Sequence, residues 1–99
     1  MLDSGLSYGG AGPVLVKVTK RPGRYLFTDE GAAVEAAGRP RGWREAGERV
    51  EEEHSVNVSR KGVVFLPAVE RKLAWLSSLP ERIAQASLAL YEELLDLEV

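Results

Sequence analysis

The residues that come nearest to a chemical site are a run of three glutamates and the only histidine of this 99-residue chain, at positions 51–54. Carboxylates and an imidazole are common ligands of divalent metals. However, successive residues of a helix point about 100° apart, so these four side chains do not converge on one ion. Because the chain has no cysteine, thiolate metal sites and thiol nucleophiles are excluded. We interpret residues 51–54 as a solvated helix end and expect neither a metal nor a cofactor.

Hydroxyl side chains beside charged residues are the remaining candidates for catalysis, at Thr28-Asp29 and Ser59-Arg60. A serine or threonine nucleophile needs a base to take its proton, and the chain has no second histidine. The fifteen acidic residues include no pair at a spacing that indicates general acid–base catalysis. The sequence therefore favours a protein without catalytic activity, and a hydrolase is only the third alternative.

Basic residues are concentrated in the first half of the chain, although the net charge is only −2. Residues 1–44 carry seven basic and four acidic groups, a balance of +3, whereas residues 45–99 carry six basic and eleven acidic groups, a balance of −5. A basic surface on an acidic protein attracts anions such as phosphates. Six cations near two predicted turns form a candidate nucleic-acid-binding site: Lys17, Lys20, Arg21, Arg24, Arg60 and Lys61.

The first half of the chain is predicted to form a β-hairpin followed by a short helix. Residues 14–19 alternate valines with longer side chains at a period of two, which is typical of a strand. Proline and glycine within residues 20–23 favour a tight turn that returns the chain as a second strand. Thr28 is expected to cap a helix over residues 32–37, and Gly38 to end it.

The second half is predicted to hold another hairpin between helices. Residues 42–53 place apolar side chains at helical spacing. Residues 54–66 then alternate, turn at residues 60–62 and continue as an apolar strand. Pro67 is expected to begin a helix, because its missing amide would be unpaired in a first turn. A capping box at residues 78–81 indicates the start of the last helix.

These elements predict an α+β fold, with an antiparallel sheet of about four strands from two β-hairpins, packed by short helices and a long C-terminal helix. Hydrophobic residues at 44% and charged residues at 28% are ordinary values for a folded domain. Residues 1–12 hold four glycines and two serines without apolar periodicity, so they are predicted to be a flexible N-terminal arm. Residues 13–99 are predicted to form a single domain.

The C-terminal helix carries two adjacent apolar stripes, more than one packing face needs. In one interpretation, one stripe covers the sheet and the other packs the preceding helix around Trp75. In the other, which we favour, part of the surplus forms a symmetric dimer seam, because a small chain gains core by associating. The candidate interface residues are Leu88, Leu90, Tyr91, Leu94 and Leu95.

Two family resemblances bear on these elements. The residues Gly23, Tyr25, Phe27, Thr28, Asp29 and Gly31 follow the pattern Gly-x-Tyr-x-Leu-Thr-Asp-x-Gly, with phenylalanine in place of leucine. In this pattern and in the order of its elements the chain resembles the domain of unknown function 1828 family, seen in bacterial and phage proteins. That resemblance implies a fold and brings no catalytic residues.

Residues 56–73 resemble, more locally, the swapped-hairpin AbrB/MazE pattern of a strand, a Lys-Gly turn, a strand, a proline and a helix. That likeness implies a DNA-binding homodimer that uses hairpin cations such as Arg60 and Lys61. The strand that follows the helix in that pattern is replaced here by the long C-terminal helix.

The function predicted from the sequence is a small interaction module that forms a homodimer, and the family resemblance implies a phage, defence or toxin–antitoxin context. A further protein partner is open, and the alternative is a nucleic-acid-binding regulator that uses the basic hairpin turns. No apolar run approaches about eighteen residues and no signal-peptide layout is present, so we expect a cytoplasmic protein with no membrane partner. Nine arginines against four lysines, and one residue each of Asn, Gln and Met, give a composition like that of thermophiles.

Overall fold

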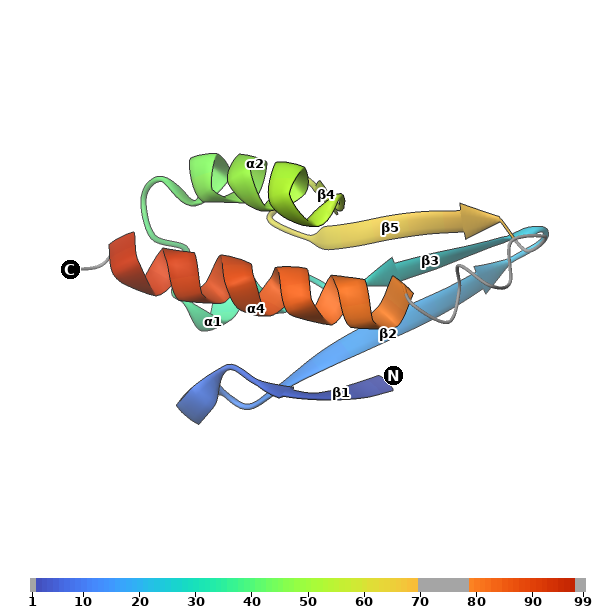
Figure 1. Cartoon of the computed structure of the whole chain (residues 1–99), viewed down its shortest axis with the longest axis horizontal. Helices are drawn as coiled ribbons and strands as arrows, with labels where there is room; N and C mark the ends of the chain where they lie inside the picture. The colour runs from blue at the N-terminus through green and yellow to red at the C-terminus, as the bar shows by residue number, and fades with distance from the viewer. Residues whose placement is uncertain (1, 70–78, 98–99) are drawn as a thin grey trace.

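The computed structural model describes residues 2–69 and 79–97. Within these ranges the chain forms β1 (Leu2–Ser7), the 3-10 helix η1 (Gly9–Ala11), β2 (Pro13–Arg21), β3 (Arg24–Thr28), α1 (Ala32–Ala36), α2 (Trp43–His54), β4 (Asn57–Val58), β5 (Val64–Val69) and α4 (Leu79–Leu97). The strands make one antiparallel sheet in the order β1-β2-β3-β5-β4 (Figure 1). The predicted α+β fold is confirmed, with five strands instead of about four.

The two predicted hairpins lie side by side in this sheet, because β3 pairs with β5. The pairing runs from Thr28 opposite Phe65 to Arg24 opposite Val69. The β2–β3 turn therefore lies at one end of β3, and the β4–β5 turn lies at the other. The basic residues of the two turns therefore lie at opposite ends of β3.

The predicted flexible arm over residues 1–12 is wrong for its described part. β1 pairs with β2, and Tyr8, which follows β1, is buried in the core. The polar and glycine residues that indicated an arm instead shape an irregular edge strand: the Ser4 hydroxyl donates to the carbonyl of Val14 at 2.7 Å, and Gly5 has a φ of 79°. The burial of its side chains alternates, but the inward-facing Ser4 is polar and the register shifts within the strand, so the sequence lacks the apolar alternation of a regular strand.

The helix predicted to begin at Pro67 is also wrong at its start, since β5 continues through this proline. The amide of Asp29 donates to the carbonyl of Val64 at 3.0 Å, which makes these two residues a hydrogen-bonded pair of the β3–β5 ladder. Counting along the ladder, the Pro67 nitrogen faces away from β3, and β4 pairs only with Val64 and Phe65. Proline therefore removes no ladder bond. The rest of that predicted helix falls in residues 70–78, outside the described residues.

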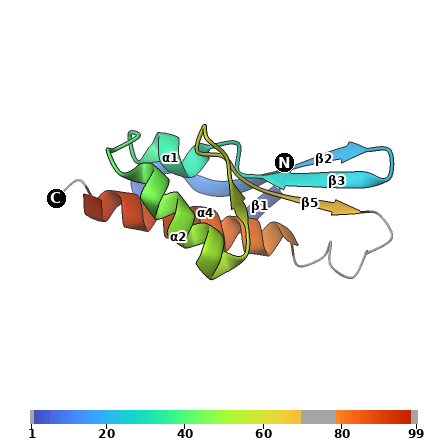
Figure 2. The same ribbon diagram turned by 90° about the horizontal axis from the view of Figure 1, so that it is seen from above.

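The core lies between the sheet and α4, which crosses one of its faces (Figures 1 and 2). The strands contribute Val16, Phe27 and Val64 from their helix-facing side. α4 contributes the stripe Ile83, Ser87, Leu90 and Leu94, and α2 contributes Ala46 and Val50. The predicted helices at α1, α2 and α4 are thus present, and α4 begins at Leu79, as its capping box indicated; Ser78 itself lies outside the described residues.

The start of α1 differs from the prediction in its capping residue. Gly31, with a φ of 80°, is the N-cap, and the Thr28 hydroxyl instead accepts from the amide of Glu30 at 2.9 Å. Thr28 therefore forms the turn that redirects the chain out of β3. The carboxylate of Asp29 accepts from the Gly31 amide at 2.8 Å and so holds the beginning of the helix.

Candidate functional site

The six cations of the predicted nucleic-acid site fall on three separate surfaces. Side chains of β2 and β3 alternate between a buried, helix-facing side and the opposite side of the sheet. This alternation places Lys17, Arg21 and Arg24 on the side away from α4 and Lys20 on the same side as the helix. The Lys20 ammonium lies 5.8 Å from the ring centre of Tyr25, which shares its side of the sheet.

The other two cations, Arg60 and Lys61, lie in the β4–β5 turn at the opposite end of β3. The carbonyl of Lys61 accepts from the Arg39 guanidinium at 3.2 Å. Arg39 is itself paired with Glu35 at 2.7 Å, which partly offsets the basic charge at this end. The structure thus brings three of the six predicted residues together and separates the rest.

The side of the sheet away from α4 has an apolar middle. We call it the uncovered face and define its central row as Thr19, Leu26 and Pro67, which are neighbours on β2, β3 and β5. Leu26 is 37% exposed, whereas Phe27, the next residue on the other side of the sheet, is 4% exposed. Among residues 2–69 and 79–97, no helix lies over this face; α2 and α4 are both on the opposite side (Figure 2).

Cations border this apolar row. Towards the β2–β3 turn lie Arg21 and Arg24, which are paired across the strands. The described residues offer neither of them an acidic partner within ion-pair distance. Towards the other end lies Lys17, whose ammonium is 3.0 Å from the Glu30 carboxylate. Among the described residues, the cations of this face without an ion-pair partner therefore lie at the turn end.

Two hollows mark the ends of the uncovered face. The larger, about 550 Å³, is lined by Arg21, Pro22, Arg24, Tyr25, Leu26 and Pro67. The smaller, about 280 Å³, is lined by Pro13, Leu15, Lys17, Asp29, Glu30 and Ala32. A face with relief can hold protruding side chains of a partner better than a flat one.

Both edges of the sheet are unsuited to strand addition. On one edge, β1 is interrupted by a register shift between Asp3 and Ser7, and Gly5 within it has a positive φ. On the other edge, β4 is two residues long, and beyond it the exposed edge of β5 carries Pro67. Bulges, short strands and prolines are the usual means of blocking edge pairing. Neither edge of this sheet is therefore suited to pairing with a strand of another chain.

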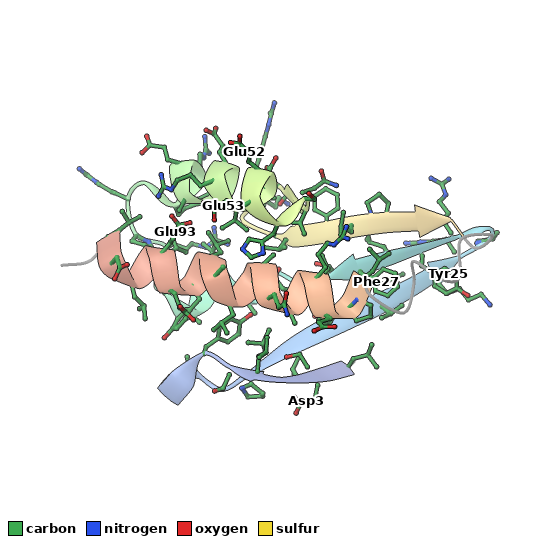
Figure 3. All side chains as sticks on the ribbon, in the orientation of Figure 1. Asp3, Tyr25, Phe27, Glu52, Glu53 and Glu93 are labelled. Carbon is green, nitrogen blue, oxygen red and sulfur yellow. The ribbon has the colours of Figure 1, made fainter. Side chains whose placement is uncertain are left out.

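Charge separates the two sides of the molecule. β2 and β3 contain four cations and no acid, whereas the acids gather on α2 and α4. Figure 3 shows Glu52 and Glu53 on α2 and Glu93 on α4, away from Tyr25 and the hairpin. The uncovered face is thus a basic, partly apolar surface on an otherwise acidic protein.

The predicted dimer seam on α4 is not available as proposed. Leu90 and Leu94 have no exposed surface within the single chain. Leu88 and Tyr91 are half-buried, and Leu95 is 39% exposed. The second apolar stripe of α4 packs against the N-terminal segment, which was predicted to be a flexible arm. The centre of the Tyr8 ring lies 5.1 Å from that of Tyr91.

A chain of buried polar groups joins three distant segments. The Ser87 hydroxyl of α4 donates to the carboxylate of Asp29 at 2.6 Å, and because Ser87 has one proton, the Tyr8 hydroxyl donates to Ser87. The amide of Val64 donates to the other Asp29 oxygen at 2.9 Å. Burial raises the pKa of Asp29 above its usual value despite these hydrogen bonds, and burial raises the pKa of Tyr8 to about 12.

This network contains the Asp29 that the sequence had marked beside a hydroxyl. Asp29 and Tyr8 are each 3% exposed and Ser87 is fully buried, so a substrate cannot reach them. The three side chains cross-link the β3–α1 turn, β5, α4 and the N-terminal segment. The three side chains are of the types that form proton relays, but because they are buried we interpret them as a structural link.

Neither a cluster of metal ligands nor a membrane-spanning helix is found among the described residues. Residues 2–69 and 79–97 contain no group of three or more His, Cys, Asp or Glu side chains placed to hold a metal ion. His54 ends α2, as the sequence analysis had interpreted. Of the described helices, none combines the length and apolar character that a membrane-spanning helix needs.

The fold and the face together define an α+β protein in which the described helices α2 and α4 lie on the same side of the sheet. Comparison of the chain with protein-family models, with curated proteins and with solved structures finds no match.

Proposed function

We propose that this protein is an interaction module that binds a partner protein through the uncovered face of its sheet. The observation that carries the proposal is the central row of the uncovered face, in which Leu26 is 37% exposed. Arg21 and Arg24 border this row at one end and Lys17 at the other, and a hollow lies at each end. An exposed apolar patch rimmed by polar residues is a common mark of a protein-binding surface. The blocked sheet edges direct binding to the face instead of to strand addition.

Nucleic acid is the weaker candidate for this face. Phosphate binding gains from many cations that act together, and here the six candidates are divided among three surfaces. Single-stranded nucleic acid also needs exposed aromatic rings on which bases stack. The middle of the uncovered face is aliphatic, and its described aromatic residue, Phe65, is half-buried.

Site-specific photo-crosslinking in the cells that make the protein tests this proposal. A benzophenone amino acid at Thr19, on the uncovered face, is expected to give a discrete adduct of higher mass. The same group at Glu52, on the outer surface of α2, is the matched control and is expected to give none. Adducts from Glu52 with none from Thr19 would place the binding surface on the helices and refute the proposal.

A further inference from the structure

We infer that the partner segment on the uncovered face is an acidic amphipathic α-helix of another protein. This inference rests on the proposed function and deepens it, because it names the shape and chemistry of the partner. Three features of the face support it: its dimensions, its apolar middle and the position of its cations.

The dimensions of the face suit a single helix. From Leu15 to Arg21 the face extends over six residue steps, which at about 3.4 Å per step is about 20 Å. It is at most about 14 Å wide where β1 pairs with β2, and about 10 Å wide across β2, β3 and β5 towards the turn. A helix is about 10 Å in diameter and about 13 residues span 20 Å. α4 covers the opposite side of the same sheet in this way, so a partner helix would complete a second layer (Figure 1).

The apolar middle requires a stripe of apolar side chains on that helix. Leu26 and Pro67 are exposed, and the larger hollow beside them has room for a protruding leucine or phenylalanine. A helix offers such side chains at every third or fourth position along one side. Burying this row is what provides affinity, since rim charges contribute little by themselves.

The cations determine the charge of the partner and its orientation. Lys17 is paired with Glu30, so among residues 2–69 and 79–97 the cations of this face without an ion-pair partner are Arg21 and Arg24, at the turn end. Carboxylates at one end of the partner helix would meet these two guanidinium groups. If that end is the helix C-terminus, the helix dipole adds to the attraction.

A second copy of this chain fits the face less well. Lys17, Arg21 and Arg24 against Glu30 leave each face with a charge of +2, so two such faces would repel each other. The area also argues against it, because a stable dimer buries about 800 Å² on each partner and this face measures at most about 20 by 14 Å.

Fluorescence anisotropy with designed peptides tests the inference. One labelled peptide of about 18 residues has leucines along one side and glutamates elsewhere, and a matched peptide has lysines in place of the glutamates. The acidic peptide is expected to bind at least about tenfold more tightly than the basic one. Arg24→Glu is expected to weaken its binding about three- to tenfold, and Leu26→Ser at least as much.

Lys20→Glu is the control, because it makes the same charge change one strand position from Arg21 but on the helix-facing side. It is expected to change the affinity less than about twofold. Circular dichroism of each variant confirms that its fold is retained. Equal binding of the acidic and basic peptides, or an effect of Lys20→Glu as large as that of Arg24→Glu, would overturn the inference.

The outcomes also separate this inference from the proposed function. If the acidic peptide does not bind at about 1 mM, or if single-stranded DNA or a second copy of the chain occupies the face, then the acidic-helix partner is wrong. If the peptide fails to bind or a second copy occupies the face, a protein adduct from Thr19 in cells would still support the proposed function, whereas occupation by single-stranded DNA would refute both proposals. Without that adduct, both proposals fail.

Discussion

Replacing Ser87 with alanine tests the buried polar link between α4, the β3–α1 turn and the N-terminal segment. Ser87→Ala removes the donor to Asp29 and leaves the Tyr8 hydroxyl without its partner, at a position with no solvent exposure. Losing a hydrogen bond to a carboxyl group and leaving a buried hydroxyl unpaired costs about 2–4 kcal/mol. Alanine regains about 0.5 kcal/mol through its higher helix propensity. The expected net loss in the free energy of unfolding is therefore about 1.5–3.5 kcal/mol, a large part of the about 5–15 kcal/mol that such a domain has.

Urea unfolding followed by tryptophan fluorescence measures this loss. Gln85→Ala, on the exposed side of the same helix, is the control for helix propensity and is expected to stay within about 0.5 kcal/mol of the wild type. Tyr8→Phe removes the hydroxyl that Ser87→Ala would leave unpaired. The double variant is therefore expected to lose less than the sum of the two single losses.

Two results would refute the reasoning. A Ser87→Ala variant as stable as Gln85→Ala would mean that the network contributes nothing to the fold. Additive losses in the Ser87 and Tyr8 variants would mean that the N-terminal segment is not linked to α4 in solution.

Three further predictions concern the packing and charge of the core. A Cβ at Gly62 would lie 2.9 Å from a methyl group of Val34, and the φ of Gly62 is 84°, so Gly62→Ala should lower the free energy of unfolding by about 2–5 kcal/mol. Gly23 has a φ of 73° but nothing within 4 Å of a Cβ, so Gly23→Ala should lower it by only about 1–2 kcal/mol. Thermal unfolding of the two variants compares these losses. Burial raises the pKa of Asp29 above its unfolded value of 3.8, so its contribution to stability is complete below that pH and is lost as the pH rises through the folded pKa. Asp29→Asn should remove this pH dependence in urea titrations carried out at increasing pH from 3.8 upwards. Leu90→Glu places a charge in the core, so the variant should be unfolded, which circular dichroism measures. A folded monomeric variant would contradict the burial of Leu90.

The sequence predicted the elements that are regular and local. The β2–β3 hairpin was predictable because its residues alternate and its turn has proline followed by glycine. α2 was predicted despite Gly47, and the structure supplies the reason for this glycine: a Cβ there would lie 3.1 Å from a methyl group of Val58, so glycine lets β4 pack closely on the helix. Such close approaches join residues distant in sequence and leave no periodic signal.

The errors arose where tertiary contacts overrode local preference. Ser4 and Gly5 favour a loop, yet pairing with β2 holds them in a strand. Pro67 favours a helix start, yet its nitrogen faces an edge where no partner is lost. Without the N-terminal strand, the apolar stripe around Tyr91 lacked Tyr8 as its partner in the predicted fold. The assignment of Leu90 and Leu94 to a dimer interface is wrong, because both are fully buried in the single chain.

The uncovered face is visible in the sequence as apolar residues at strand positions where an alternating pattern predicts polar ones. In an antiparallel sheet covered on one side, alternate residues should be polar. Leu15 and Leu26 occupy such positions on neighbouring strands, together with Pro67 on the next. Because Leu26 is exposed in the free chain, Leu26→Ser should change the free energy of unfolding by no more than about 0.5 kcal/mol. Folding alone therefore does not require leucine there, whereas the proposed binding on the uncovered face would. This difference between the two requirements is the physical reason for assigning the row to function.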